Sequence, residues 1–259
     1  MAKIIGLVNQ KGGVSKTTTA INLGVYLAAL GKYVLLVDVD PQANATSGLG
    51  IDPGNVSLSL YHSLAGGLLP EEVVKKTGIL GYDIIPSSSD LAGATIELVG
   101  MANREFKLYE LLRRIRTNYD YILIDCPPSL GLLTINGLVA ADEVIIPVQC
   151  EYFALEGLGQ LLKTIELVQE NLSSPIKVKG ALLTMYDRRN RLARQVRKEV
   201  ERNFPEYVFE AIIPRCVRLA EAPSFGQTIL QYDPRSRGAK AYYQLAREII
   251  KLDNKEKKI

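Results

Sequence analysis

The stretch that decides the fold is Lys11-Gly12-Gly13-Val14-Ser15-Lys16-Thr17-Thr18, near the start of the chain. The apolar run 4–8 precedes it, and a helix-like run that ends near Leu30 follows it. A strand, a glycine-rich turn carrying Lys-Thr and then a helix form the arrangement that holds a nucleotide triphosphate. The alternative is an ordinary glycine-rich turn. A second motif, Asp125 at the end of another expected strand, makes this alternative less favoured, because both motifs stand where a nucleotide site needs them.

This turn and the second motif together predict a site for ATP or ADP with Mg²⁺. Backbone N–H groups of 11–18 and the positive end of the next helix attract phosphates. Lys16 is placed to reach the β- and γ-phosphates, and the Thr17 hydroxyl is placed to bind Mg²⁺. Asp125 ends the apolar run 121–124, where a carboxylate holds Mg²⁺ through a water molecule.

A third candidate motif is Asp38-Val39-Asp40-Pro41-Gln42, at the end of the strand expected over 33–38. A carboxylate near the γ-phosphate can position Mg²⁺ or the attacking water. Aspartate before proline also initiates turns, which is the plainer interpretation. The residues alone leave both interpretations open, so Asp40 is an additional candidate for the metal site.

Apolar runs alternate with helix-period segments along the chain. Most of these runs are continuously apolar, as in strands that are buried on both faces of a parallel sheet. The fold class expected is α/β, with a doubly wound, mainly parallel sheet flanked by helices, as in P-loop NTPases. The expected strands are 3–8, 33–38, 82–86, 120–125, 143–148, 177–184 and 207–213. The expected helices are 17–30, 104–117, 131–140, 156–171, 191–203 and 239–252.

Length and composition suit one large domain, because 259 residues with 47% apolar side chains can build a sizeable core. We expect a single ATPase domain over 1–253, with loops and short helices over 39–80 and a disordered charged tail over 254–259. The three cysteines lack paired metal-ligand spacing, and no apolar run approaches the roughly 20 residues of a membrane span. The expected location is cytoplasmic, with reduced thiols and no signal peptide.

Five segments of the sequence resemble the ParA/Soj family of chromosome- and plasmid-partitioning ATPases. This family lies within the wider deviant Walker A group, which includes the MinD cell-division ATPases. The last of the five segments favours ParA/Soj over MinD. The segments are KGGVSKTT at 11–18, DVDPQANATSGLG at 38–50, YILIDCPPSLG at 121–131, EYFALEGL at 151–158 and IPRCVRLAEAPSFGQTI at 213–229.

The resemblance implies a role for each matched position. Lys11 would reach across a homodimer interface to the partner's ATP, and Gly12 would lie where the two chains pack closely. Asp40 would support hydrolysis, so the implied catalytic set is Lys11, Lys16 and Asp40. The implied nucleotide contacts are Lys11, Gly12, Gly13, Val14, Ser15, Lys16, Thr17 and Thr18 in the loop, with Met185, Pro214 and Cys216 near the adenine.

Two positions depart from the family pattern. The family has glycine where this chain has Ser15; if that site needs a positive φ, serine costs roughly 1–2 kcal/mol. Serine keeps its N–H, so we expect measurable but weaker ATP binding. The family commonly has asparagine where this chain has Cys216, and a thiol is a weak hydrogen-bonding partner for the adenine or its sugar.

Basic residues gather over 188–202, and part of them fall on one stripe of the expected helix 191–203. Such a stripe can neutralise DNA phosphates without reading bases, whereas a solvated helix face is the plainer interpretation. The resemblance favours DNA. The candidate DNA-binding residues are Arg189, Arg191, Arg194, Lys198 and Arg218. The apolar side of the helix is expected to carry Leu192, Val196 and Val200.

The resemblance implies a cycle in which ATP binding causes dimerisation, the dimer binds DNA non-specifically, and slow hydrolysis releases it. A centromere-binding protein of the ParB/Spo0J type would stimulate hydrolysis, and the protein would be associated with the nucleoid. One alternative is a MinD-like regulator that is recruited to a membrane. The pattern of the expected helix 239–252 indicates packing in the core, so we expect no stable membrane association. Another is an ATP- or ADP-binding protein whose hydrolysis Ser15 weakens.

Overall fold

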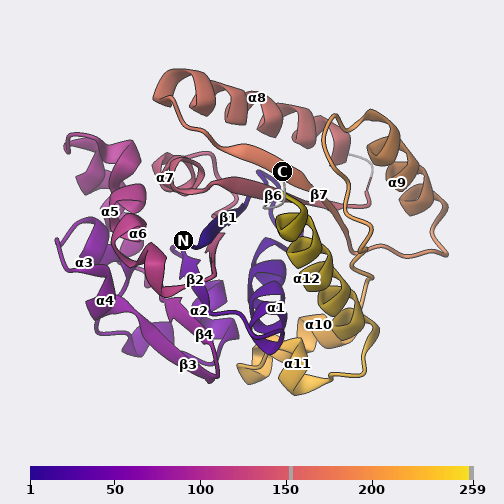
Figure 1. Cartoon of the computed structure of the whole chain (residues 1–259), viewed down its shortest axis with the longest axis horizontal. Coiled ribbons are helices and arrows are strands. Elements are labelled where there is room, and N and C mark those ends of the chain that lie inside the picture. The colour runs from indigo at the N-terminus through magenta and orange to yellow at the C-terminus, as the bar shows by residue number, and fades with distance from the viewer. Residues whose placement is uncertain (152–153, 257–259) are drawn as a thin grey trace.

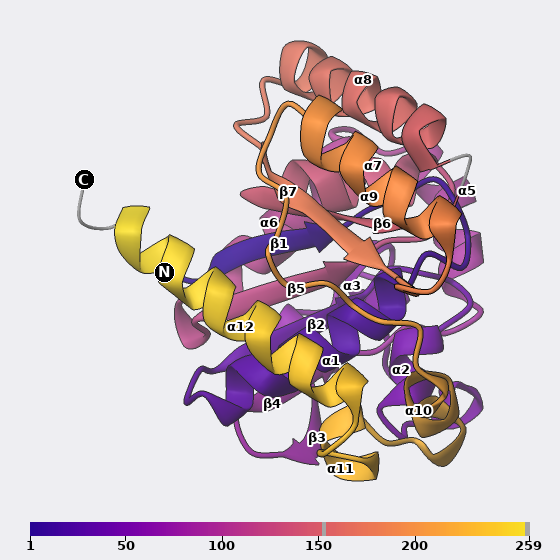
Figure 2. The same cartoon turned by 90° about the vertical axis from the view of Figure 1, so that its right-hand side faces the viewer.

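The computed structural model describes residues 1–151 and 154–256, without the side chains of 154–156. Within this part, a seven-stranded sheet runs through the molecule in the order β3-β4-β2-β5-β1-β6-β7 (Figures 1 and 2). Neighbouring strands are parallel except for β3 and β4, which confirms the doubly wound, mainly parallel sheet. The strands are β1 (Lys3–Leu7), β2 (Val34–Asp38), β3 (Lys75–Ile79), β4 (Tyr82–Ile85), β5 (Tyr121–Asp125), β6 (Glu143–Gln149) and β7 (Lys177–Thr184).

Helices cover both faces of the sheet (Figures 1 and 2). Alternate strand residues enter two separate cores, since Ile122 and Ile124 belong to one core and Leu123 to the other. Burial on both faces explains why the strands read as continuous apolar runs. The helices are α1 (Lys16–Ala29), α2 (Asn44–Gly48), α3 (Leu60–Leu64), α4 (Pro70–Val73), α5 (Leu91–Val99), α6 (Lys107–Ile115), α7 (Leu132–Ala140), α8 (Ala154–Leu172), α9 (Arg191–Asn203), α10 (Val217–Glu221), α11 (Ile229–Tyr232) and α12 (Arg237–Glu256).

The segment 207–213 was expected to be a strand, and this expectation is wrong. It lies along β7 and forms only an isolated bridge between Ala181 and Val208. The backbone N–H groups of Glu210 and Ala211 donate instead to the Glu248 carboxylate of α12, at 2.7 and 2.9 Å. A side chain distant in sequence therefore takes the donors that a strand ladder would use.

The segment 39–80 contains short helices and loops as expected, and it also contains the unexpected strand β3. This strand lies at the edge of the sheet and is largely solvent-accessible, so it has no continuous apolar run. Charged residues such as Lys75 and Lys76 are typical of sheet edges. The polar pattern of 75–79 therefore hid the strand.

The last helix, α12, extends three residues into the segment expected to be a disordered tail. The Asp253 and Glu256 carboxylates accept hydrogen bonds from Lys3 Nζ at the start of β1, which anchors the final turn. The rest of that segment, 257–259, lies outside the described residues. In the part of the chain that is described, no helix is both long enough and apolar enough to cross a bilayer.

Candidate functional site

The candidate site lies at the carboxyl edge of the sheet, where β1, β2 and β5 end. Leu7 at the end of β1 pairs with Asp125, and Asp38 at the end of β2 also pairs with Asp125. The glycine-rich loop starts just after β1 and leads into α1 at Lys16. Parallel strands thus bring the loop and both strand-end carboxylates to one edge, where ligands bind in sheets of this kind.

The loop adopts a left-handed backbone at two positions, Gly13 with a φ of 74° and Ser15 with a φ of 72°. Glycine adopts this conformation readily, whereas the Cβ of serine crowds the following carbonyl oxygen. Ser15 is the N-cap residue of α1, yet its side chain makes no capping hydrogen bond. Position 15 therefore has the positive φ at which serine was expected to be costly.

Lys16 is buried at the base of the loop, with 7% of its surface exposed. Its Nζ donates to the backbone oxygen of Lys11 at 3.3 Å. Burial lowers the pKa of Lys16, and the nearby Asp125 carboxylate opposes that shift. A buried ammonium at the end of a glycine-rich loop is suited to the phosphate groups of a nucleotide.

Asp125 is fully buried, and neither carboxylate oxygen has a hydrogen-bond partner within the described residues. Burial raises the pKa of Asp125 well above its usual range, and the neighbouring Asp38 carboxylate raises it further. The nearby Thr17 hydroxyl and the positive charge of Lys16 lower this pKa, although the hydroxyl is not in hydrogen-bonding geometry with either carboxylate oxygen. Because buried polar groups normally have partners, two orphaned oxygens beside the Thr17 hydroxyl fit a Mg²⁺ site.

Asp38 organises the loop that carries Asp40. Its carboxylate accepts hydrogen bonds from the N–H and hydroxyl of Thr46, at 2.8 and 2.7 Å, and from the Asp40 N–H at 3.2 Å. The Ser87 N–H donates to Thr46 Oγ1 and the Ser87 hydroxyl donates to the Asp40 backbone oxygen, at 2.9 and 2.7 Å. Burial raises the pKa of Asp38 to about 6, although the Thr46 hydrogen bonds oppose the shift.

The sequence did not predict that Thr46 and Ser87 hold the loop of Asp40 by hydrogen bonds. Thr46 lies inside the segment 38–50, but only the two aspartates there carried an expected chemistry. Ser87 is 41 residues away from Thr46, and only the parallel pairing of β2 with β4 brings the two together.

Lys11 and Gly12 lie at the rim of the site. Lys11 Nζ is 3.2 Å from Glu151 Oε2, in an ion pair whose two side chains are 40% and 50% exposed. A Cβ added at Gly12 would meet no atom within 4 Å. Lys11 is therefore held by its own chain, and the surface at Gly12 is open.

The expected adenine positions come together at the end of β7. Tyr186, which follows Met185, pairs with Pro214 in an isolated bridge. The Thr184 hydroxyl donates to the backbone oxygen of Val14 at 3.0 Å, which joins this end of β7 to the phosphate loop. Cys216 is the N-cap residue of α10 and makes no side-chain capping bond.

The candidate DNA-binding residues lie on exposed surface of α9, α10 and the turn before α9. The Arg189 side chain is 84% exposed and lies 3.9 Å from the Asp187 carboxylate. Arg218 forms ion pairs of 2.8 Å with Glu221 and 3.7 Å with Asp233. The expected apolar face needs one correction, because Leu192 is exposed and Ala193 is buried instead. Arg191, Arg194 and Lys198 are all exposed.

The family model described as "AAA domain" matches residues 2–178. The chain is 55% identical to the sporulation initiation inhibitor protein Soj of Bacillus subtilis, over 96% of this chain and 98% of that protein. It is 51% identical to the chromosome partitioning protein ParA of Myxococcus xanthus, over 98% and 89%.

A solved structure with a closely similar fold bears a different name. It is described as cobyrinic acid a,c-diamide synthase from Mycobacterium smegmatis with bound ATP analog and magnesium. Its TM-score is 0.86 and its sequence identity is 38%, with 96% of this chain and 95% of that chain covered.

Proposed function

The chain belongs to the Soj/ParA family of chromosome-partitioning ATPases, and on this premise we propose that it hydrolyses ATP to drive DNA segregation. In this cycle the ATP-bound chain forms a homodimer, the dimer binds DNA non-specifically, and hydrolysis releases it. The observation that carries the proposal is the pair of orphaned Asp125 oxygens, which lie near Lys16 and Thr17 behind the glycine-rich loop.

In the proposed site, backbone N–H groups of 11–18 and the Lys16 ammonium hold the phosphates of ATP or ADP. The Thr17 hydroxyl would bind Mg²⁺, and the Asp125 carboxylate would hold it through a water molecule, with Asp40 as an additional candidate. Mg²⁺ supplies charge neutralisation of the phosphates when it is bound. The adenine is held near Met185, Pro214 and Cys216.

We assign Asp40 to hydrolysis, where its carboxylate orients the attacking water. Its backbone is fixed on both sides, because its N–H donates to Asp38 and its carbonyl oxygen accepts from Ser87. Lys11 acts on the ATP of the partner chain, where a cation offsets the charge of the transferring phosphoryl group. This role requires Lys11 to leave the Glu151 carboxylate that holds it in the single chain.

The proposed DNA surface consists of Arg189, Arg191, Arg194, Lys198 and Arg218. Their exposure supports contacts with backbone phosphates, which need no particular base sequence. A protein of the ParB/Spo0J type would stimulate hydrolysis, and the site of action would be the nucleoid in the cytoplasm. Chromosomal DNA is the cargo that we propose, because the relatives ParA and Soj are named for chromosome partitioning, and plasmid DNA is the alternative cargo.

One alternative has specific support, namely nucleotide binding with weakened hydrolysis. The left-handed backbone at Ser15 supports it, because strain in the loop opposes the conformation that surrounds the phosphates. A MinD-like membrane role has less support. The apolar side chains Leu245 and Ile249 of α12 are buried in the core and offer no free face for a bilayer.

Sedimentation with and without ATP, together with DNA and vesicle binding, tests the proposal. We expect a monomer in the absence of ATP and a dimer that pellets with non-specific DNA in its presence. Arg189→Glu should weaken DNA binding at least tenfold while ATP binding is unchanged, and Arg113→Glu on α6 is the matched control. ATP-loaded protein that pelleted with anionic vesicles and ignored DNA would contradict the proposal.

A further inference from the structure

The segment 217–232 lies between the candidate ATP site and the proposed DNA surface. It consists of α10, the 3₁₀ helix Ala222–Phe225 and α11, and it packs beside α2 (Figure 2). The helix α2 follows Asp40 in the chain, whereas α10 carries the candidate DNA contact Arg218. One short segment thus adjoins both the loop assigned to ATP hydrolysis and a cation assigned to DNA.

Two glycines form a direct backbone contact between this segment and the chain after α2. A Cβ added at Gly226 would lie 2.6 Å from the Cα of Gly50, closer than real Cβ atoms approach a neighbour. A Cβ added at Gly50 would lie 3.0 Å from the Gly226 carbonyl oxygen. Because no side chain separates the two backbones, no rotamer change absorbs a displacement, and a shift of Gly50 toward the segment has to move Gly226.

A series of hydrogen bonds connects Gly50 to the loop of Asp40. The Ala43 N–H donates to the Asp40 carbonyl oxygen, and the Ala43 carbonyl oxygen accepts in turn from the Ser47 N–H. The Gly50 N–H donates to the Ser47 carbonyl oxygen, and all three distances are 2.9 Å. These bonds run the length of α2, so a displacement of Asp40 toward a nucleotide reaches Gly50.

Arg218 is held by carboxylates in this structure. Its Nη1 is 2.8 Å from Glu221 Oε2, and its Nε is 3.7 Å from Asp233 Oδ2. These two negative charges offset the charge that Arg218 offers to a DNA phosphate. The three side chains are 54%, 37% and 34% exposed, and ion pairs as accessible as these open easily. Arg218 is therefore a cation that can be either held or released.

The Gly226 turn also positions the carboxylate that holds Arg218. Phe225 precedes Gly226, and its ring stacks on the Tyr232 ring with centroids 5.3 Å apart. The Tyr232 hydroxyl donates to Glu221 Oε2 at 3.1 Å, the same oxygen that pairs with Arg218. A displacement of the turn thus disturbs the stacked rings and, through them, the ion pair of Glu221.

The opposite side of the segment rests on α1 and α12. The Ile229 N–H of α11 donates to Asn22 Oδ1 of α1 at 2.8 Å. Leu219 of α10 packs on Gly238 at the start of α12, where an added Cβ would lie 2.6 Å from the leucine Cγ. The segment is thus enclosed between α2 and the pair formed by α1 and α12.

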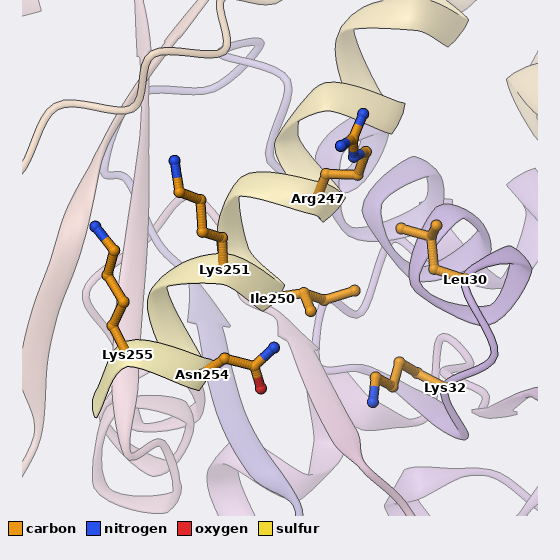
Figure 3. Close-up of a pocket in the computed structure, with 7 residues that line it drawn as sticks. All are labelled: Leu30, Lys32, Arg247, Ile250, Lys251, Asn254 and Lys255. Carbon is orange, nitrogen blue, oxygen red and sulfur yellow. The ribbon is translucent and has the colours of Figure 1, made fainter. Parts of the chain in front are cut away.

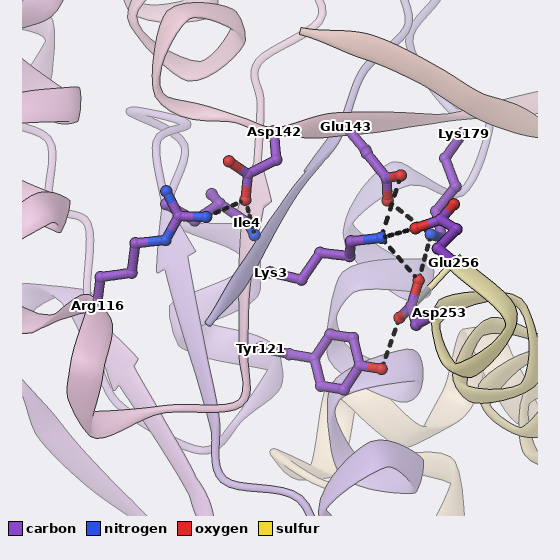
Figure 4. A network of polar contacts seen from close by, with 9 residues as sticks. All are labelled: Lys3, Ile4, Arg116, Tyr121, Asp142, Glu143, Lys179, Asp253 and Glu256. Atoms are coloured by element: carbon purple, nitrogen blue, oxygen red, sulfur yellow. Dashed lines mark hydrogen bonds and ion pairs between the residues drawn. The ribbon is translucent and has the colours of Figure 1, made fainter. Parts of the chain in front are cut away.

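The helices α1 and α12 are fixed to each other and to the sheet. The hydroxyls of Thr19 and Tyr242 lie 3.1 Å apart, and Ile250 points toward Leu30 (Figure 3). Asp253, at the far end of α12, accepts from lysines of β1 and β7 and from a tyrosine of β5 (Figure 4). This support does not follow a shift of the α2 connection, so the segment has to change its own conformation.

We propose that 217–232 is a switch through which the ATP site controls the DNA contact of Arg218. Without ATP, Glu221 and Asp233 hold the guanidinium. When the loop of Asp40 closes on ATP, the glycine contact displaces the turn, the ion pairs open, and the guanidinium is free to bind a DNA phosphate. The inference rests on the proposed function, because it gives the link by which ATP binding raises DNA affinity and hydrolysis lowers it.

Fluorescence anisotropy with a short labelled duplex, with and without ATP at low salt, tests the switch. Glu221→Gln removes the charge that holds Arg218 and keeps an oxygen for the Tyr232 hydroxyl. It should raise DNA affinity without ATP roughly threefold, the size expected when one exposed ion pair opens, and change the affinity with ATP much less. The gain should vanish in the Arg218→Ala background, since no guanidinium is left to release.

Glu201→Gln is the matched control, because it removes a carboxylate that pairs with Arg197 on α9, beside the proposed DNA surface. It should raise DNA affinity by the same factor with and without ATP. A fall in ATP dependence in this control equal to that in Glu221→Gln would overturn the switch in favour of a general charge effect.

Gly226→Ala tests the glycine contact itself. The added Cβ forces the turn away from Gly50, which is the displacement that loop closure is proposed to cause. DNA affinity without ATP should rise roughly threefold, as in Glu221→Gln, while ATP binding is unchanged. Gly31→Ala is the control, because it has a positive φ of 81° and a Cβ there meets nothing within 4 Å, so it should change stability alone. Glu221→Gln leaves the backbone as it is, so the two variants test the switch independently.

Both variants should still form the ATP-dependent dimer in sedimentation velocity. If they dimerise and keep the ATP dependence of DNA binding that the wild type shows, the switch is wrong and the proposed function stands. Wild-type protein that dimerises with ATP but binds no DNA would overturn the proposed function and the switch with it.

Discussion

Ser15 stores backbone strain next to the phosphates. Its φ of 72° and ψ of 30° place an L-residue in the left-handed region, at a cost of roughly 1–2 kcal/mol. Its side chain makes no capping hydrogen bond that would offset this cost. The loop must still present its N–H groups to an anion, so strain at this residue acts on both stability and nucleotide binding.

Ser15→Gly should relieve this strain. We expect the free energy of unfolding to rise by about 1 kcal/mol, less than the full strain because glycine is also more flexible in the unfolded chain. ATP should bind more tightly and turn over faster, as measured by calorimetry and phosphate release. Ser173→Gly is the control, since Ser173 has a φ of 49° far from the loop, and it should change stability alone. Unchanged ATP affinity and rate in Ser15→Gly would mean that serine is tolerated.

Asp125 is a second residue whose proposed function lowers the stability of the fold, because a carboxylate suited to Mg²⁺ is buried away from water. The pKa values of Asp125 and Asp38 are raised in the folded protein. Above pH 3.8, the ordinary pKa of these side chains, the folded state therefore keeps protons that the unfolded state has released. Stability contributed by this pair is therefore greatest at low pH, and it falls as the pH rises from about 4 through about 6.

Asp125→Asn should raise the free energy of unfolding of the Mg²⁺-free protein at pH 7.5 by about 1–3 kcal/mol, because the buried carboxyl must either stay charged away from water or bind a proton that it releases on unfolding, and asparagine carries neither cost. The fall in stability between pH 4 and pH 6 should become smaller. Mg²⁺-dependent turnover should be lost, and added Mg²⁺-ATP should stabilise the variant less than the wild type. Thermal denaturation across pH checks the sign, and a variant less stable than wild type at pH 7.5 would contradict it.

At the scale of elements, the connection from β2 to α2 is held by contacts with the segment after β4. The Thr46 hydroxyl stands between the Asp38 carboxylate and the Ser87 N–H, and the Ser87 hydroxyl reaches the Asp40 carbonyl oxygen. Thr46 touches no expected ligand, so it is a positioning residue for Asp40.

Thr46→Val should lower kcat roughly tenfold and leave KM nearly unchanged, because about 1.4 kcal/mol of lost positioning corresponds to a factor of ten in rate. Thr46→Ser keeps the hydroxyl and should restore most of the rate. Steady-state ATP hydrolysis measures both. If KM rose as strongly as kcat fell, or if serine gave no rescue, the positioning role would be wrong.

Local patterns predicted the elements that are buried on both faces. The six parallel strands read as apolar runs, and their order of alternation with helices indicated the doubly wound sheet. Strand β3 was missed because an edge strand carries lysines, and 207–213 was overpredicted because Glu248 takes two of its backbone donors. Neither effect is local, since each depends on which surface the finished fold exposes or covers.

The candidate site also contains residues that short motifs predicted and contacts that only the fold reveals. Lys16, Thr17 and Asp125 could be placed from short motifs, because a loop after one strand and a carboxylate after another meet at one sheet edge. The hydrogen bonds through Thr46 and Ser87, and the ion pair between Lys11 and Glu151, join segments 41 and 140 residues apart. Only the topology of the sheet brings those partners together.

At the scale of the whole molecule, the surface around Gly12 would lie between the two chains of the proposed ATP-bound dimer. In one chain this surface is open, because a Cβ at Gly12 would meet no atom within 4 Å, and its φ lies outside the left-handed region. A side chain here therefore costs the monomer little. It would cost the proposed dimer much more, because both copies of position 12 lie in the same close contact.

Gly12→Val should leave the melting temperature and ATP binding of the monomer nearly unchanged and prevent ATP-dependent dimerisation. Overpacking costs about 1–3 kcal/mol per site, so two copies should weaken the dimer by about 2–6 kcal/mol, or roughly 30-fold or more. Sedimentation velocity with ATP measures the loss, and Gly93→Val on α5, another position where a Cβ meets nothing, should dimerise normally. Because Lys11 acts only across the interface in the proposed mechanism, ATP turnover of Gly12→Val should fall together with dimerisation. Normal dimerisation by this variant would place the interface elsewhere and would remove Lys11 from the partner's ATP.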